Sequence, residues 1–188
     1  IPLRKAIPTN NDKKIDFLLN FLEEQTFIPR LTFLIYTNEN YSYKDCYSKK
    51  HRYFYLNKNL EKKYKFERVI FQLQNNNKIG IVVHTKNIDF INTYINTKNE
   101  DLFKQRIISN FNELFEDNPY INPLTCNEKI SIMNWRASQP SGCAVPLYLQ
   151  FSEKYRIGFC GDWFEGEGFG RIEGSILSAL ILEKKFNT

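Results

Sequence analysis

The sequence predicts an α+β protein in which an antiparallel or mixed sheet is covered by helices. Two observations support this class. Segments rich in β-branched and aromatic residues alternate with segments whose apolar residues recur at helical spacing. The chain of 188 residues is also 42% hydrophobic and 15% aromatic, with no repeat or low-complexity linker. Such a composition is sufficient for a substantial hydrophobic core.

Three helices are expected ahead of residue 120. The first begins after Asn11 or Asp12, since either side chain can cap a helix start. A short helix lies near residues 88–95, and a longer one ends before Pro119. In each helix the apolar residues fall on one stripe: Ile15, Leu18, Leu19 and Leu22; Ile88, Ile91 and Ile95; Leu102, Ile107, Ile108, Phe111, Leu114 and Phe115.

The expected strands cover residues 31–36, 52–56, 66–73, 78–84 and 128–135. Pro29 opens the first strand, and a polar, tyrosine-rich loop follows it to about Lys50. Three asparagines, residues 75–77, join two strands, and asparagine tolerates the positive φ of a tight turn. These two strands therefore form a predicted hairpin.

The C-terminal quarter predicts a strand, a loop and a helix. Tyr155–Cys160 reads as the strand, Gly161 and Asp162 follow it, and an apolar run of about fifteen residues opens after a glycine-rich turn. A helix start reached through glycines exposes unpaired N–H groups and the positive end of the helix dipole. Such a start can bind anionic or electron-rich ligand atoms, and Asp162 adds an acceptor for a hydroxyl. The pattern indicates cofactor binding.

This stretch resembles the C-terminal FAD-binding signature of the flavin-containing amine oxidoreductases, in particular the renalase-like, bacterial-type branch. In that family a strand ends in Gly-Asp, and a short loop leads to Val/Ile-Glu-Gly-Ala/Ser and a helix rich in Ser, Ala and Leu. The matching residues are Gly161, Asp162, Ile172, Glu173, Gly174, Ser175 and Ser178.

A weaker resemblance extends upstream. Ile79–His84, followed by a helical stretch, is similar to a strand and helix that cross the family's substrate domain. Asn134-Trp135-Arg136 is similar to the family's His-Arg-Trp-Arg-Tyr-Ala segment and retains Trp135 and Arg136. Met133 and Asn134 replace the family's His-Arg pair, and Ala137 replaces its Tyr.

The resemblance implies a set of cofactor-binding residues. Asp162, after Gly161, would accept a hydrogen bond from the ribityl chain or a nearby hydroxyl of FAD, unless it serves as an Asx turn or helix-entry cap. Gly174 would let the helix backbone approach the flavin, and N–H groups near Gly174 and Ser175 would face its pyrimidine carbonyl. Glu173 would stabilise the same helix from its first turn.

The resemblance also assigns a pocket and a division of the chain. Trp135 and Arg136 are candidates for the wall of the flavin or substrate pocket, with a core tryptophan and a surface arginine as the alternative. Residues 1–140 correspond to a substrate-binding domain, and residues 141–188 to the last segment of an FAD-binding, Rossmann-like domain. No catalytic residue is assigned, because the flavin itself carries out hydride transfer.

One part of the family pattern lies outside this sequence. The Gly-x-Gly-x-x-Gly turn that receives the FAD pyrophosphate does not occur, and all eight glycines are at Gly80 or beyond. We therefore expect the C-terminal portion of a longer FAD-dependent oxidoreductase, missing its N-terminal FAD-binding half and inactive alone. Its substrate would be a small-molecule amine or a reduced nicotinamide-type compound. The alternative is a complete small protein whose ending only imitates the signature.

Charge and cysteine usage bound the other classes. There are 26 Lys and Arg against 21 Asp and Glu, and basic and aromatic residues interleave over residues 43–65, as in single-strand nucleic-acid binders. A net charge of +5 is modest, so nucleic acid is an unlikely partner, and a non-catalytic interaction domain is the other alternative. The four cysteines are too widely spaced for a metal site. With no run of eighteen apolar residues, we expect no membrane span and a cytoplasmic protein.

Overall fold

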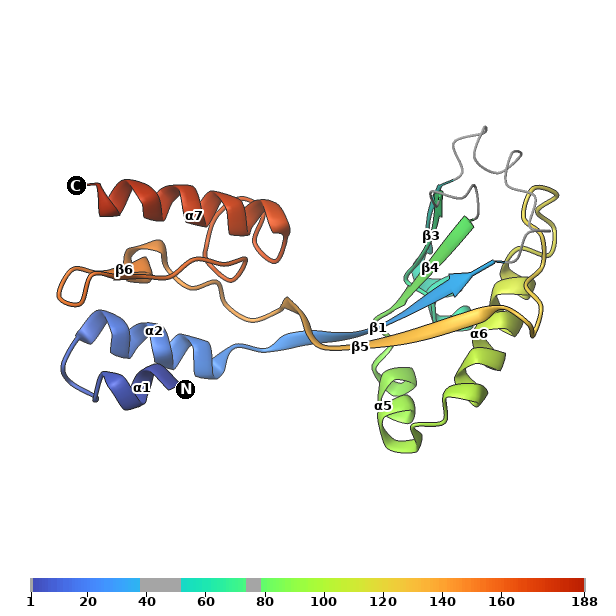
Figure 1. The fold of residues 1–188 in the computed structure, drawn as a ribbon, viewed down its shortest axis with the longest axis horizontal. Coiled ribbons are helices and arrows are strands. Elements are labelled where there is room, and N and C mark those ends of the chain that lie inside the picture. Colours follow the sequence, from blue (N-terminus) through green and yellow to red (C-terminus); the bar gives the residue numbers. More distant parts are fainter. Residues whose placement is uncertain (1, 38–51, 74–78, 188) are drawn as a thin grey trace. The chain divides into compact units, whose positions relative to one another are not determined.

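The computed structural model describes residues 2–37, 52–73 and 79–187 and has the predicted α+β class (Figure 1). The chain divides into two compact units. Unit 1 comprises Ile1–Ile28 and Ala137–Thr188, and unit 2 comprises Pro29–Arg136. The N-terminal 28 residues thus fold with the C-terminal segment, whereas the sequence analysis grouped residues 1–140 together, and the chain returns to unit 1 at Ala137.

Unit 2 is built on a five-stranded sheet. Its strand order is β2 (Tyr53–Tyr55), β3 (Arg68–Leu73), β4 (Ile79–Thr85), β1 (Phe27–Tyr36) and β5 (Lys129–Pro140). The pairs β2–β3, β3–β4 and β4–β1 are antiparallel. Leu73 lies opposite Ile79, which fits the predicted hairpin, although its turn at Asn75–Asn77 is outside the described residues. The tyrosine-rich loop is likewise outside them.

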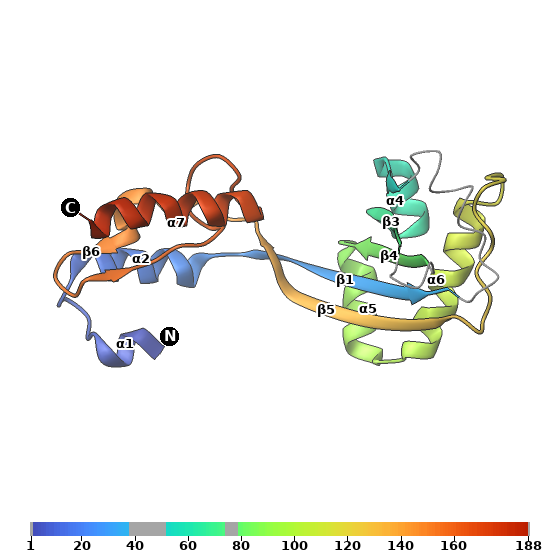
Figure 2. The same ribbon diagram turned by 45° about the horizontal axis from the view of Figure 1, so that its top comes forward.

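Three helices pack on one face of this sheet: α4 (Lys58–Tyr64), α5 (Ile88–Thr97) and α6 (Glu100–Leu114) (Figures 1 and 2). An asparagine caps each start, and the side chains of Asn57, Asn87 and Asn99 accept a backbone N–H from the first turn. The helices α5 and α6 confirm the prediction. Helix α4 was not predicted, because lysines dominate its seven residues and only Tyr64 is buried.

Phenylalanines form much of the core between sheet and helices. Phe71 of β3 packs against Phe111 and Phe115, with ring centroids 6.2 and 6.1 Å apart, and Phe54 of β2 lies 5.0 Å from Phe115. Strand residues alternate between the two faces, so Leu31, Phe33 and Ile35 of β1 are buried with these rings. The residues between them occupy the opposite face of the sheet.

Unit 1 contains α1 (Pro2–Ala6), α2 (Lys13–Glu24), the 3-10 turn η1 (Leu147–Gln150), the short strands β6 (Phe151–Ser152) and β7 (Ile157–Gly158), and α7 (Ile172–Phe186). The prediction of α2 is confirmed. Asp12 caps it by accepting the N–H groups of Lys14 at 2.8 Å and Ile15 at 3.3 Å. The Ser152 hydroxyl donates to the same carboxylate, which ties the helix start to β6.

Two predicted strands have other limits in the structure. Of the expected strand Tyr155–Cys160, only β7 pairs, because residues 153–156 form a turn in which Arg156 has φ +52°. The expected strand ending at Trp135 instead continues to Pro140 as β5. Beyond residue 136 the two chain segments stay adjacent, since Ser141 N donates to Thr26 O at 2.9 Å.

Candidate functional site

The strand–loop–helix segment of unit 1 is held together by Ser178. This buried side chain of α7 accepts the N–H of Gly161 at 2.9 Å and lies 3.0 Å from the Gly161 carbonyl oxygen. Across the same loop, Gly170 N donates to Asp162 O at 2.7 Å. These bonds bring Gly161 and Asp162 to the beginning of α7. Two parts of the predicted cofactor site are therefore adjacent, although the sequence analysis did not include Ser178 in that site.

The glycine loop also packs directly on the helix backbone. A Cβ atom added to Gly174 would lie 2.3 Å from the carbonyl oxygen of Gly168 and 2.7 Å from its carbonyl carbon. Gly168 has φ +80°, a conformation that side chains rarely adopt. Both positions therefore require glycine, and together they fix the path of the loop over the first turn of α7.

Several polar groups at this helix start have no partner among the described residues. Arg171 is the N-cap but makes no side-chain capping bond, and the first helical hydrogen bond runs from Ser175 N to Arg171 O at 3.3 Å. The N–H groups of residues 172–174 therefore lack a helical acceptor. The Asp162 carboxylate accepts no bond within the described part of the chain, so it acts neither as an Asx turn nor as the helix cap there. Glu173 is exposed in the first turn.

Behind the loop, two buried polar atoms also lack partners in the described structure. One is Nε1 of Trp163, whose ring is so close that a Cβ on Gly161 would lie 2.9 Å from it. The other is Oε1 of Gln150, a fully buried residue whose amide nitrogen donates to Ser178 O. Buried unpaired polar atoms cost free energy, so both are unusual in a settled core.

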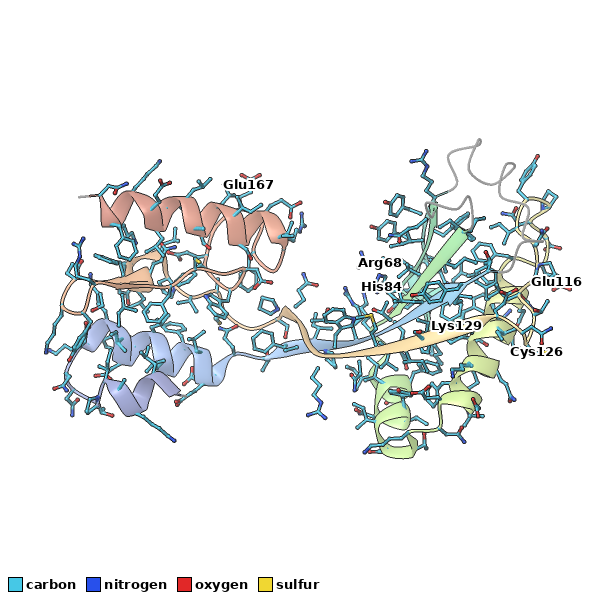
Figure 3. All side chains as sticks on the ribbon, in the orientation of Figure 1. Arg68, His84, Glu116, Cys126, Lys129 and Glu167 are labelled. Carbon is cyan, nitrogen blue, oxygen red and sulfur yellow. The ribbon has the colours of Figure 1, made fainter. Side chains whose placement is uncertain are left out.

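A second group of polar residues forms a row across the sheet of unit 2. Tyr55 lies opposite Arg68, Arg68 opposite His84, and His84 opposite Thr32. The Thr32 hydroxyl accepts the indole N–H of Trp135 at 3.1 Å and lies 2.9 Å from Nδ1 of His84. We call these five residues the sheet row. It is on the face opposite α4–α6, and Figure 3 shows Arg68 and His84 side by side in it.

The hydrogen bonds of Thr32 assign the tautomer of His84. Thr32 is buried, and its hydroxyl proton needs an acceptor; the acceptor within reach in the described chain is Nδ1 of His84. The imidazole proton is then on Nε2. Burial, together with the charges of Arg68 and Arg30, lowers the pKa of His84 to about 4, and the charge of Glu67 acts against this shift. His84 is therefore neutral at physiological pH and presents Nε2–H as a donor.

The cations beside the row differ in their pairing. Arg30 lies 3.1 Å from Glu67, and Lys86 lies 3.4 Å from the same carboxylate and 3.9 Å from Glu61. Arg68, in contrast, has neither an ion pair nor a hydrogen bond to any residue that the structure describes, and its Nε is buried. One guanidinium of this face thus has no counter-ion among the residues that the structure describes.

The structure separates the two predicted pocket residues. Trp135 is 46% exposed and is on the sheet-row face, so it is not a core tryptophan. Arg136 follows it on the strand and is also exposed, but alternation directs it to the opposite face. The sequence analysis assigned no role to His84 beyond the end of a strand. Its position out of phase with the buried residues of β4 was the available signal.

The neutral state of His84 predicts a pH dependence of stability. The unfolded chain binds a proton near pH 6.5, whereas the folded chain does so only near pH 4. Stability should be complete above pH 6.5 and fall as the pH drops from 6.5 to 4, by about 1–2 kcal/mol after allowing for partial exposure. Urea unfolding across this range should give a flatter pH profile for His84→Gln than for the wild type. Equal pH profiles would contradict the lowered pKa of His84. The other histidine, His51, is present in both proteins, so its contribution does not affect the comparison.

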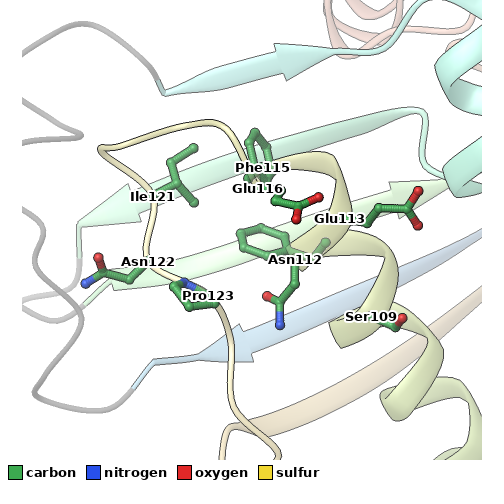
Figure 4. A pocket seen from close by; sticks show the side chains of 9 residues that line it. Ser109, Asn112, Glu113, Phe115, Glu116, Ile121, Asn122 and Pro123 are labelled. Carbon is green, nitrogen blue, oxygen red and sulfur yellow. The ribbon is translucent and has the colours of Figure 1, made fainter.

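A hollow of about 500 Å³ is found at the end of α6 (Figure 4). Its lining includes Phe111 and Phe115, and two of its polar side chains, Asn112 and Glu113, are already engaged. Asn112 binds both backbone atoms of Leu124, at 2.7 and 2.9 Å, and Glu113 pairs with Lys63 at 2.6 Å. We assign no chemistry to this hollow.

The described residues contain neither a candidate metal site nor a candidate membrane-spanning helix. No cluster of three His, Cys, Asp or Glu that could hold a metal ion occurs there, and the described cysteines, Cys126, Cys143 and Cys160, are free and exposed. Among the same residues, none of the helices combines the length and apolarity needed to span a bilayer.

Comparison of the sequence with models of known protein families and with curated proteins finds no match.

Proposed function

We propose that this chain is the C-terminal portion of a cytoplasmic FAD-dependent oxidoreductase of the amine oxidase or renalase type. In this proposal unit 1 supplies the last FAD-binding segment, of Rossmann-like type, and unit 2 is the substrate domain. The substrate, a small-molecule amine or a reduced nicotinamide-type compound, would transfer hydride to the flavin. The flavin supplies the redox chemistry when bound, and the chain's residues bind and orient it.

The observation that carries the proposal is the start of α7. The three N–H groups of residues 172–174 have no helical acceptor, and the Asp162 carboxylate accepts no bond from the described residues, in a segment where Gly168 packs directly on Gly174. Donors at a helix start suit an electron-rich carbonyl or an anion, and a carboxylate suits a sugar-type hydroxyl. A flavin with its ribityl chain offers both kinds of group. The residues therefore fit FAD as the cofactor.

The outer surface of α7 supports the further proposal that another part of an FAD-binding domain packs on it. Four apolar residues of this helix are exposed: Ile172 is 74% exposed, Ile176 56%, Leu180 51% and Leu177 40%. Ile172, Ile176 and Leu180 are four residues apart and Leu177 is three residues before Leu180, which places them on one side of the helix. An apolar stripe of this kind is typical of a helix that is covered in its complete domain. The missing N-terminal half is the partner we assign to it.

One observation favours a second candidate function, the binding of single-stranded nucleic acid. Tyr53 and Tyr55 are 61% and 70% exposed on the sheet-row face, beside Arg68, and Trp135 is half exposed there. Aromatic rings on an open sheet with cations between them can stack bases and contact phosphates. This function predicts polynucleotide affinity that falls steeply with added salt.

The proposal predicts that the 188-residue chain, purified alone, is colourless. The pyrophosphate-binding turn supplies much of the affinity for FAD, and its glycine fingerprint does not occur in this sequence. Absorbance near 450 nm of the purified chain measures bound flavin directly. Near-stoichiometric yellow flavin would contradict our assignment of roles to the two halves.

The coding sequence upstream of Ile1 provides the direct test of the proposed function. A strand followed by Gly-x-Gly-x-x-Gly in the same reading frame is the expected result. A start codon close to Ile1 would overturn the proposal, because the chain would then have no segment to receive the pyrophosphate.

A further inference from the structure

The sheet row belongs to unit 2 and has no part in the flavin-binding segment that we propose for unit 1. All five of its residues carry hydrogen-bonding or charged groups, and they lie on neighbouring strands about 5 Å apart. Within unit 2, the described helices cover only the other face of the sheet. The row is thus a polar surface built at fixed spacing on rigid strands, which is a favourable setting for a ligand site.

The charges of this surface favour an anion. Three cations, Arg30, Arg68 and Lys86, lie beside the row, and the carboxylates that pair with two of them are Glu67, with Arg30 and Lys86, and Glu61 of α4, with Lys86. Arg68 is the cation without a partner among the described residues, and its Nε is buried. A guanidinium in this state gains most from a carboxylate or phosphate, which it can bind through two parallel N–H groups.

The neighbour of Arg68 in the row presents a compatible donor. Nδ1 of His84 is held by the Thr32 hydroxyl at 2.9 Å, which places the imidazole proton on Nε2. Trp135 fixes the far side of Thr32 through its indole N–H at 3.1 Å. The chain of bonds from Trp135 through Thr32 to His84 therefore orients a neutral donor one strand away from the Arg68 guanidinium.

The ends of the row offer aromatic surface. Trp135 and Tyr55 are 46% and 70% exposed, and the Trp135 ring is fixed in direction by its bond to Thr32. A ring held in this way can stack on a planar ligand with little loss of side-chain freedom. The strands of Arg68 and Trp135 are three strand spacings apart, about 15 Å between Cα atoms. Because both side chains are long, the distance between the guanidinium and the indole ring can be shorter than this.

We propose that the sheet row binds a small ligand in which a planar ring carries a carboxylate or phosphate, with the anion at Arg68 and Nε2 of His84 and the ring against Trp135. The role of this ligand as the substrate rests on the proposed function, whereas its binding does not. The same charges disfavour a simple cationic amine, so the inference narrows the substrate class.

Calorimetric titration of the 188-residue chain without flavin tests the binding itself. The probes are phenylacetate and phenyl phosphate, compared with neutral benzyl alcohol and cationic benzylamine. We expect at least one of the two anions to bind at least 10-fold more tightly than benzyl alcohol, and we expect benzylamine not to bind. The preferred anion identifies the group as carboxylate or phosphate. Equal affinity for all four probes would overturn the proposal.

Substitution then locates the site. Arg68→Gln should weaken binding of the preferred anion about 10-fold or more, the loss expected for a hydrogen bond to a charged group. Arg106→Gln removes an exposed guanidinium from α6, on the other face of the sheet, and should have no effect. Unchanged affinity in a folded Arg68→Gln would overturn the assignment.

A second variant and a second readout keep the test decisive if Arg68→Gln does not fold. Thr32→Val retains the shape of the side chain but releases Nδ1 of His84, and it should also weaken anion binding. In the wild type, the ¹⁵N resonance of His84 Nε2 should shift when the anion is added. An unchanged resonance would contradict the assignment of His84 to the binding site. Tight salt-sensitive binding of oligothymidylate without binding of either small anion would assign the face to nucleic acid instead and overturn the proposal.

Discussion

Replacing Asp162 with alanine is expected to weaken FAD binding about 5- to 150-fold in the polypeptide that includes the dinucleotide-binding half. The Asp162 carboxylate accepts no hydrogen bond from the described residues, and the backbone of Asp162 is bonded to Gly170, two residues before α7. In the proposed complex it accepts a cofactor hydroxyl, which alanine would leave unpaired at a cost of about 1–3 kcal/mol. Flavin dissociation measured by fluorescence gives the affinity.

The fold should survive this substitution. What holds the loop at Asp162 is its backbone carbonyl, which accepts Gly170 N at 2.7 Å, and alanine keeps that bond. The melting temperature of Asp162→Ala should therefore stay within a degree or two of the wild type, on the scale of surface substitutions. A lowered melting temperature with unchanged flavin affinity would show that the residue shapes the turn and has no role toward the cofactor.

Replacing Gly174 with alanine is expected to destabilise unit 1 by about 3 kcal/mol. In an exposed helix position alanine is better than glycine by about 1 kcal/mol, so propensity alone predicts the opposite sign. Here the new Cβ would be 2.3 Å from the Gly168 carbonyl oxygen. The obstacle is backbone, which cannot rotate aside as a side chain can, so the loop or the helix must move.

Gly166→Ala is the matched control for this effect. Gly166 has φ +128° but no heavy atom within 4 Å of a new Cβ, so alanine there tests backbone strain without a collision. We expect a smaller loss, of about 1–2 kcal/mol. Urea unfolding followed by Trp163 fluorescence in a Trp135→Phe background reports on unit 1 in both variants. Equal losses in the two variants would contradict the role of the Gly168 contact.

Local patterns made most of the elements predictable. The stripe of Ile15, Leu18 and Leu19 after Asp12 fixes α2, and the buried alternation of β1 and β4 follows from their apolar residues. Helix α4 escaped because seven residues with three lysines have no clear apolar period, and its Asn57 cap is the signal that was available. The strand of residues 155–160 was overextended, since the positive φ of Arg156 depends on the turn between β6 and β7.

The candidate sites divide in the same way. Gly161, Asp162 and Gly174 are near in sequence, so a local motif was enough to group them. The sheet row was out of reach, because Thr32, His84 and Trp135 come from three strands and meet only through register. A pairing alignment of the strands would have placed Thr32 and Arg68 on either side of His84. Single residues such as His84 carry no motif of their own.

The discontinuous make-up of unit 1 has a consequence for the order of folding. Its two pieces, Ile1–Ile28 and Ala137–Thr188, are separated in the chain by all of unit 2. Bringing together the ends of a flexible segment of about 100 residues costs about 4 kcal/mol of chain entropy. In the folded unit 2, β1 and β5 are neighbouring strands, so its entry and exit points are already close.

Formation of unit 2 would therefore assist the formation of unit 1. Once the sheet has formed, the two pieces of unit 1 are tethered through the neighbouring strands β1 and β5, so their association would take place at high effective concentration. During synthesis the N-terminal helices must wait for residues 137–188 before they gain their partners, whereas the sheet can form as soon as β5 emerges. A substitution that unfolds unit 2 would thus also hinder the folding of the glycine loop of unit 1, although it changes none of the contacts of that loop.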